Sequence, residues 1–82
     1  MSEEMKKALE YRINLYERNA DRWDDELDAA YTAGNKDMVL KCNRYRQRYI
    51  HLKQGMLITL ETMGIEWECH EDENYKTVYK IL

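Results

Sequence analysis

Apolar residues recur along this chain in alternating steps of four and three, first in the N-terminal half and again after residue 37. The first series is Leu9, Ile13, Tyr16, Ala20, Trp23, Leu27 and Ala30, and the second is Met38, Cys42, Tyr45, Tyr49, Leu52, Met56, Leu60 and Met63. A sustained period of about 3.5 residues indicates helices that pack along one seam, as in coiled coils. We therefore predict helices over residues 3–33 and 36–63.

Capping residues mark the ends of both predicted helices. Ser2 and Asn35 are good N-caps, whereas Gly34 and Gly64 can adopt the left-handed conformation that ends a helix. Because the link at residues 33–35 is very short, the two helices must be antiparallel neighbours. Folding the chain at this link pairs the seam residues Leu27 with Cys42, Ala20 with Tyr49, Ile13 with Met56, and Leu9 with Leu60.

After Gly64 the apolar residues alternate with polar ones, which predicts a β-hairpin with strands over residues 65–70 and 75–82. A three-residue loop of Asp72, Glu73 and Asn74 puts Asn74 at the position that often needs a left-handed backbone. The resulting register sets Ile65 opposite Ile81, Trp67 opposite Tyr79, Cys69 opposite Thr77, and Glu66 opposite Lys80. A slip of one residue would mix the apolar and polar faces.

A two-stranded hairpin is marginally stable in water, so it must pack on the helices. Apolar residues outside the seam gather at the end of the helical pair that holds the N-terminus: Ala8, Tyr11, Leu15, Ile50 and Leu57. We expect Ile65, Trp67 and Tyr79 to cover this surface. The predicted fold is mainly α, an antiparallel two-helix coiled-coil hairpin followed by a C-terminal β-hairpin (α+β), in a single domain over residues 1–82.

Self-association is expected from the aromatic content. One helical hairpin buries a single stripe on each helix, and seven tyrosines and two tryptophans exceed what that stripe needs. We therefore expect a homodimer, in a four-helix arrangement, with either the outward aspartates of the first helix or the surplus apolar surface at the contact.

Charge is distributed in blocks, although the net charge is only −3. Residues 41–55 contain basic side chains and no acid, and residues 61–73 contain acidic side chains and no Lys or Arg. The helix flanks predict three ion pairs across the seam: Glu17 with Lys53, Asp24 with Arg46, and Glu26 with Lys41. A basic strip remains without acidic partners, formed by Arg12, Arg22, Arg44 and Arg48, and the outward stripe of Asp21, Asp25 and Asp28 is also unpaired.

The hairpin tip is a second candidate contact surface. Glu71, Asp72 and Glu73 have no counter-charge nearby in the sequence, and Tyr75 follows them. Such a tip can steer the protein toward a basic partner. The alternative is a soluble turn that keeps the strand edges from aggregating.

Composition and motifs argue against enzyme chemistry, cofactors and metal. Ser2 is the only serine, Cys69 and His70 point to opposite faces of a strand, and neither a CxxC motif nor a histidine pair at metal spacing occurs. The acidic amino terminus predicts no signal peptide, and no apolar run is long enough to span a membrane, so a cytoplasmic location is expected.

Two functions remain open from the sequence. The first is a small non-enzymatic protein-interaction module, an adaptor or inhibitor that binds another macromolecule as a homo-oligomer. The alternative is a nucleic-acid-binding accessory protein that uses the basic strip to contact phosphates.

Overall fold

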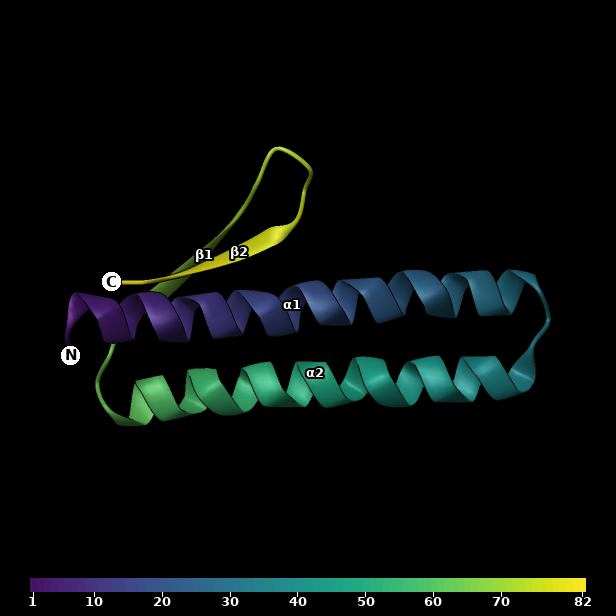
Figure 1. Cartoon of the computed structure of the whole chain (residues 1–82), viewed down its shortest axis with the longest axis horizontal. Helices are drawn as coiled ribbons and strands as arrows, with labels where there is room; N and C mark the ends of the chain where they lie inside the picture. The colour runs from purple at the N-terminus through teal and green to yellow at the C-terminus, as the bar shows by residue number, and fades with distance from the viewer.

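In the computed structural model, which describes all 82 residues, two long helices lie side by side and run antiparallel (Figure 1). Helix α1 spans Glu3–Thr32 and helix α2 spans Lys36–Thr62. The side chains of Ser2 and Asn35 each accept a hydrogen bond from a backbone N–H of the first turn, at 3.1 Å. The predicted helical hairpin and its N-caps are confirmed, and the helix ends lie within one residue of the prediction.

Both helices end in the same left-handed turn, at Gly34 (φ 67°) and Gly64 (φ 74°). After α2, the Gly64 N–H donates to the Glu61 carbonyl and the Ile65 N–H donates to the Leu60 carbonyl. These two bonds satisfy carbonyl groups that the end of a helix would otherwise leave free. They also bring Ile65 back against Leu60, so the chain re-enters the apolar cluster and begins the hairpin there.

Small and aliphatic residues and two pairs of aromatic rings fill the seam between the helices. Trp23 and Tyr45 stack with ring centroids 4.8 Å apart, and the rings of Tyr16 and Tyr49 lie 6.3 Å apart. The buried seam residues are Ile13, Ala20, Leu27, Ala30, Cys42 and Leu60. Two predicted seam residues are exposed, Leu52 at 40% and Met63 at 64%, and the other seam residues are half-buried.

Two of the three predicted ion pairs across the seam are confirmed. Lys53 Nζ lies 2.7 Å from Glu17 Oε2, and Arg46 Nε lies 3.3 Å from Asp24 Oδ1. The predicted pair of Glu26 with Lys41 does not form, and both side chains are exposed to solvent. The Lys53–Glu17 pair is the more buried one, with side chains 16% and 14% exposed.

The β-hairpin consists of β1 (Trp67–Glu71) and β2 (Thr77–Ile81), paired antiparallel. Trp67 lies opposite Ile81 and Cys69 lies opposite Tyr79. The predicted register is therefore wrong by two residues. Because side chains alternate with a period of two, the predicted faces of the strands are unchanged by this shift.

The turn explains the difference in register. Asp72 Oδ1 accepts hydrogen bonds from the N–H groups of Asn74 (2.9 Å) and Lys76 (3.0 Å), and the Asp72 N–H donates to the Lys76 carbonyl. Asp72 and Lys76 thus close a loop of Glu73, Asn74 and Tyr75, one residue later than predicted. Tyr75 (φ 61°), not Asn74, has the left-handed backbone.

The hairpin packs on the half of the helical pair next to the N-terminus (Figure 1). Its core consists of Ile13, Leu57, Leu60, Tyr79 and Ile81, with Leu9, Met56, Ile65 and Trp67 packed around them. The predicted location is confirmed, but the residues expected from α1 are wrong: Ala8, Tyr11 and Leu15 are exposed. Instead of these three residues, polar side chains of α1 contact the backbone of β2.

Three polar side chains of α1 bind the backbone of β2, and we call them the polar ladder: Glu10, Asn14 and Arg18. Glu10 Oε1 accepts from the Ile81 N–H (2.9 Å), and Arg18 Nη2 donates to the Thr77 carbonyl. Between them, Asn14 binds both backbone groups of Tyr79. Steps of four along a helix and two along a strand cover similar distances, about 6 Å and 6.7 Å, which allows this alignment. The polar ladder thus provides hydrogen-bond partners for backbone groups on the edge of β2 that faces away from β1.

Candidate interaction surfaces

The acidic hairpin tip is exposed, but its three carboxylates do not have equal roles. Glu71 and Glu73 are exposed and form no ion pair. Asp72 is part of the turn, and the hydrogen bond from the Lys76 N–H, assisted by that from Asn74, lowers the pKa of its carboxyl group. Two carboxylates therefore remain free for an external contact, and the third stabilises the turn.

Tyr75 is the most exposed aromatic residue of the tip, with 84% of its surface accessible. Its φ of 61° lies in the left-handed region, which glycine adopts freely but which L residues other than Asn and Asp rarely adopt. The turn would be less strained with glycine at this position. The tip projects away from the helices (Figure 1), which agrees with the high exposure of Tyr75.

The basic strip remains free of ion pairs within the chain. Arg12, Arg22, Arg44 and Arg48 are exposed, and none lies within ion-pair distance of a carboxylate. Arg22 lies over the ring of Trp23, with 5.7 Å between the guanidinium carbon and the ring centroid. The strip is on the helices, whereas the acidic tip is on the projecting turn, so the structure does not join the two predicted contact sets into one site.

The predicted aspartate stripe is reduced by one member. Asp21 Oδ2 lies 3.2 Å from Arg18 Nε, although the N–H does not point at the oxygen and neither atom completes a hydrogen bond. Burial raises the pKa of Asp21, while the charge of Arg18 opposes this shift. Asp25 and Asp28 stay exposed and unpaired.

An apolar groove of about 550 Å³ lies between the start of α1 and the end of α2. We call it the methionine groove, because Met1, Met5, Met56 and Met63 line it together with leucines such as Leu52. Gly55, inside α2, also lines it, and a Cβ atom at this position would meet nothing within 4 Å. Packing within the chain therefore does not require glycine here, although glycine weakens a helix interior by about 1 kcal/mol relative to alanine.

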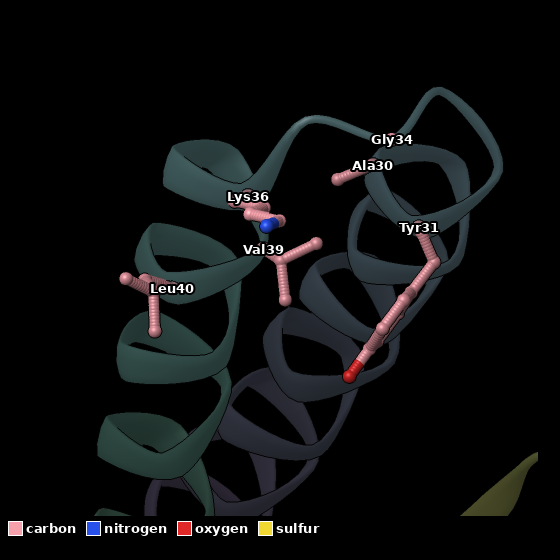
Figure 2. A pocket seen from close by; sticks show the side chains of 6 residues that line it. All are labelled: Ala30, Tyr31, Gly34, Lys36, Val39 and Leu40. Atoms are coloured by element: carbon pink, nitrogen blue, oxygen red, sulfur yellow. The ribbon is translucent and has the colours of Figure 1, made fainter.

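A second apolar hollow, of about 470 Å³, lies at the turn between the helices (Figure 2). Val39 points toward the gap between α1 and α2, Tyr31 extends along α1 away from the turn, and Leu40 points outward (Figure 2). Tyr31 and Leu40 are both exposed. This hollow is open and carries one charged side chain, that of Lys36.

The outer edge of β1 has no partner. Backbone hydrogen bonds join Glu66 to Leu82 and Asp72 to Lys76 at the two ends of the hairpin. The even-numbered residues of β1 therefore point their backbone groups toward β2. The backbone groups of Trp67, Cys69 and Glu71 therefore point away from β2. They form no hydrogen bond with a side chain or another loop, unlike the matching edge of β2. Sequence reasoning missed both edges, because neither the polar ladder nor its absence beside β1 follows a hydrophobic pattern.

No three His, Cys, Asp or Glu side chains come together as a metal-binding group. Cys42 is buried and Cys69 is exposed, and both are free thiols. Neither helix has an apolar stretch long enough to cross a bilayer. Comparison with protein-family models, with curated proteins and with solved structures gave no match to this chain.

Proposed function

We propose that this protein is a small non-enzymatic protein-interaction module, acting as an adaptor or inhibitor, with its β-hairpin as the contact surface. The observation that carries the proposal is Tyr75, an aromatic side chain 84% exposed on a left-handed backbone. The backbone conformation is unfavourable for folding, and the exposed ring buries too little surface within the chain to offset it. A contact with another protein accounts for an aromatic residue held in this position.

The surroundings of Tyr75 suit a basic partner. Tyrosine is enriched among the residues that dominate binding energy at protein interfaces. Glu71 and Glu73 lie on either side of Asp72 and form no ion pair, and such free carboxylates increase the association rate with a positively charged surface.

Photo-crosslinking from the tip tests this function. A photoreactive aromatic amino acid replaces Tyr75 in the full-length protein, and a matched protein carries it in place of Tyr31, which is also exposed but lies at the opposite end of the helices. We expect position 75, and not position 31, to form a crosslink with one defined protein in the native host. Glu71→Lys together with Glu73→Lys should suppress that crosslink. Equal crosslinking from both positions would reject the tip as the contact surface.

Self-association is the second part of the proposal, with the methionine groove as the contact between two copies. Only nine of the 82 residues are buried, and the seam residues Leu52 and Met63 remain exposed on this face. A second helical hairpin packed on the groove would cover them and give four helices. Sedimentation at micromolar concentration should show a dimer. A monomer at all accessible concentrations would reject this part alone.

Nucleic-acid binding is a second candidate function, favoured by the four unpaired arginines of the basic strip. Phosphate contacts release counterions, so binding through this strip must weaken steeply as salt rises. Gel shifts at two salt concentrations, with wild type and with Arg44→Glu/Arg48→Glu, distinguish the candidates. A salt-dependent shift abolished by the double substitution would favour nucleic acid, and its absence favours the interaction module.

A further inference from the structure

We propose that the outer edge of β1 binds an extended, lysine- or arginine-rich segment of a partner protein, which adds as a third strand to the sheet. This inference rests on the proposed function of the hairpin and specifies how the hairpin recognises its partner. It is carried by the difference between the two edges of the sheet. The edge of β2 is occupied by the polar ladder, whereas the edge of β1 has no partner in the chain.

The backbone defines the shape of the bound segment. Trp67, Cys69 and Glu71 each direct an N–H and a C=O away from β2, at alternate residues. A row of alternating donors and acceptors is matched by another extended strand, which lies about 4.8 Å away when paired. Every residue of β1 after Trp67 is exposed, so no side chain of the chain itself blocks the approach.

Charge defines the chemistry of the bound segment. Glu66, Glu68, Glu71 and Glu73 lie on or beside β1, all are exposed, and none forms an ion pair. Opposite charges on neighbouring strands stabilise a sheet, and like charges destabilise it. Glu66 and Glu68 share one face of the sheet, whereas Glu71 lies on the other face. A strand with lysine or arginine at alternate positions therefore fits the row of Glu66 and Glu68. A second copy of β1 does not fit, because it would place one row of glutamates beside another.

A hollow beside the start of β1 offers room for a side chain of the added strand. It has a volume of about 530 Å³ and is lined by Gly64, Ile65, Trp67 and Leu82 together with Glu61 and Glu66. An apolar wall with two carboxylates suits the long stem and charged head of a lysine or arginine. The edge and the hollow thus favour the same partner chemistry.

Amide hydrogen exchange on the isotopically labelled protein tests the inference directly. The probe is a short capped peptide in which lysine alternates with threonine and valine, and the control peptide has glutamate in place of lysine. We expect the lysine peptide to slow exchange of the Cys69 and Glu71 amides. The Tyr79 and Ile81 amides should not change, because Asn14 and Glu10 already bind them. Lysine-peptide binding without slower exchange at Cys69 and Glu71 would overturn the added strand.

Two variants separate the backbone contribution from the charge contribution. Cys69→Pro removes an outward N–H but no bond to β2, and proline is tolerated on edge strands, so we expect about tenfold weaker binding of the lysine peptide. Retained protection of the Tyr79 amide shows that the hairpin is still folded. If that protection is lost, the double variant Glu66→Lys/Glu68→Lys tests the inference instead, because it leaves the backbone unchanged. This variant should bind the glutamate peptide more tightly than the lysine peptide. An unchanged preference would overturn the inference.

The test of the added strand and the test of the proposed function can give different results. Crosslinking from position 75 without exchange protection at β1 would retain the tip as the contact and reject the added strand. Loss of both signals would reject the hairpin as a binding surface.

Discussion

Asn14 and Tyr79 are joined by two hydrogen bonds between one side chain and one backbone residue. The Tyr79 N–H donates to Asn14 Oδ1 at 2.7 Å, and Asn14 Nδ2 donates to the Tyr79 carbonyl at 2.9 Å. The amide of asparagine thereby replaces the neighbouring strand that β2 lacks on this side. The half-buried contact links residues that are 65 positions apart in the sequence.

Asn14→Ala should lower the free energy of unfolding by about 2 kcal/mol, because it leaves both Tyr79 backbone groups without partners in a half-buried site. Asn14→Asp should have an intermediate effect, since a carboxylate can accept from the N–H but cannot donate to the carbonyl. Chemical denaturation measures both. Asn19→Ala is the control, on the same helix and without a side-chain hydrogen bond, and a similar loss there would contradict the role of Asn14.

Lys53 should be the most important charged residue for stability. Burial by itself lowers the pKa of Lys53, but the hydrogen bond to Glu17 and the nearby Tyr79 together raise this pKa above its ordinary value. The ammonium also lies 5.3 Å from the centroid of the Tyr79 ring, which ties α2 to the hairpin. Lys53→Ala leaves Glu17 largely buried without its partner and should reduce the unfolding free energy by about 2–3 kcal/mol.

The control for Lys53 is Lys6→Ala, which breaks a pair at 3.6 Å with Glu3, whose side chain is 80% exposed. Exposed pairs contribute about 0–1 kcal/mol, so this variant should unfold almost like wild type. The pH dependence has a defined sign. Because the folded-state pKa of Lys53 is raised, its contribution is complete below the unfolded value of about 10.4 and is lost as pH rises through the folded value.

The turn should become less stable in acid because of Asp72. Its pKa is lowered in the folded state, so its contribution is complete above the unfolded value of about 3.9 and is lost as pH falls through the lower folded value. Asp72→Asn can still accept from the N–H groups of Asn74 and Lys76 but does not titrate. The difference in melting temperature between wild type and Asp72→Asn should therefore change only on the acidic side. A constant difference from neutral pH downward would contradict this account.

Tyr75→Gly should stabilise the fold while removing the proposed contact residue. Relief of the left-handed backbone contributes about 1–2 kcal/mol, and the greater freedom of glycine in the unfolded chain offsets about half of it. We expect a melting temperature a few degrees higher, measured by circular dichroism, together with loss of partner binding. A lower melting temperature would show that the Tyr75 ring contributes to folding.

Gly55→Gln should separate monomer stability from self-association. Glutamine is a better helix former than glycine, so the unfolding free energy of the monomer should rise by about 0.5 kcal/mol. The new side chain occupies open space in the methionine groove, so the dimer detected by sedimentation should dissociate more readily. Gln54→Ala, a neighbouring exposed position outside the groove, is the control. An unchanged dimer would place the contact between copies elsewhere.

The periodic part of the fold could be predicted from the sequence, and the chemically specific part could not. Steps of four and three, with caps at Ser2 and Asn35, determine the helical hairpin because burial follows that period directly. The hairpin register depended on one side chain, Asp72, whose two hydrogen bonds fix where the turn begins. In the pattern of charges along the sequence, Asp72 does not differ from its neighbours Glu71 and Glu73.

The position of the hairpin on the helices could be predicted only in part. Apolar residues such as Leu57 correctly indicated which end of the helices it covers. Tyr11 and Leu15 on α1 were predicted wrongly, because only Leu9 and Ile13 supply apolar contacts from α1 to the hairpin. The neighbouring face of α1 is polar and binds backbone groups of β2. A side chain that pairs with a distant backbone leaves no periodic signal, so Glu10, Asn14 and Arg18 looked like ordinary solvated positions.

The polar ladder also limits how far a strand can follow a helix. Each rung falls about 0.7 Å further out of step, since four helical residues advance about 6 Å and two strand residues about 6.7 Å, and each rung turns about 40° around the helix axis. The short side chain, Asn14, occupies the middle rung, and the longer Glu10 and Arg18 reach from the ends. A fourth rung would join Arg22 to Tyr75, but Tyr75 lies in the loop beyond β2, and Arg22 lies about 80° around the helix axis from Asn14. The mismatch between the two repeats thus limits the number of rungs. A longer hairpin would extend only the part that projects from the helices and would add no hydrogen bond between β2 and α1.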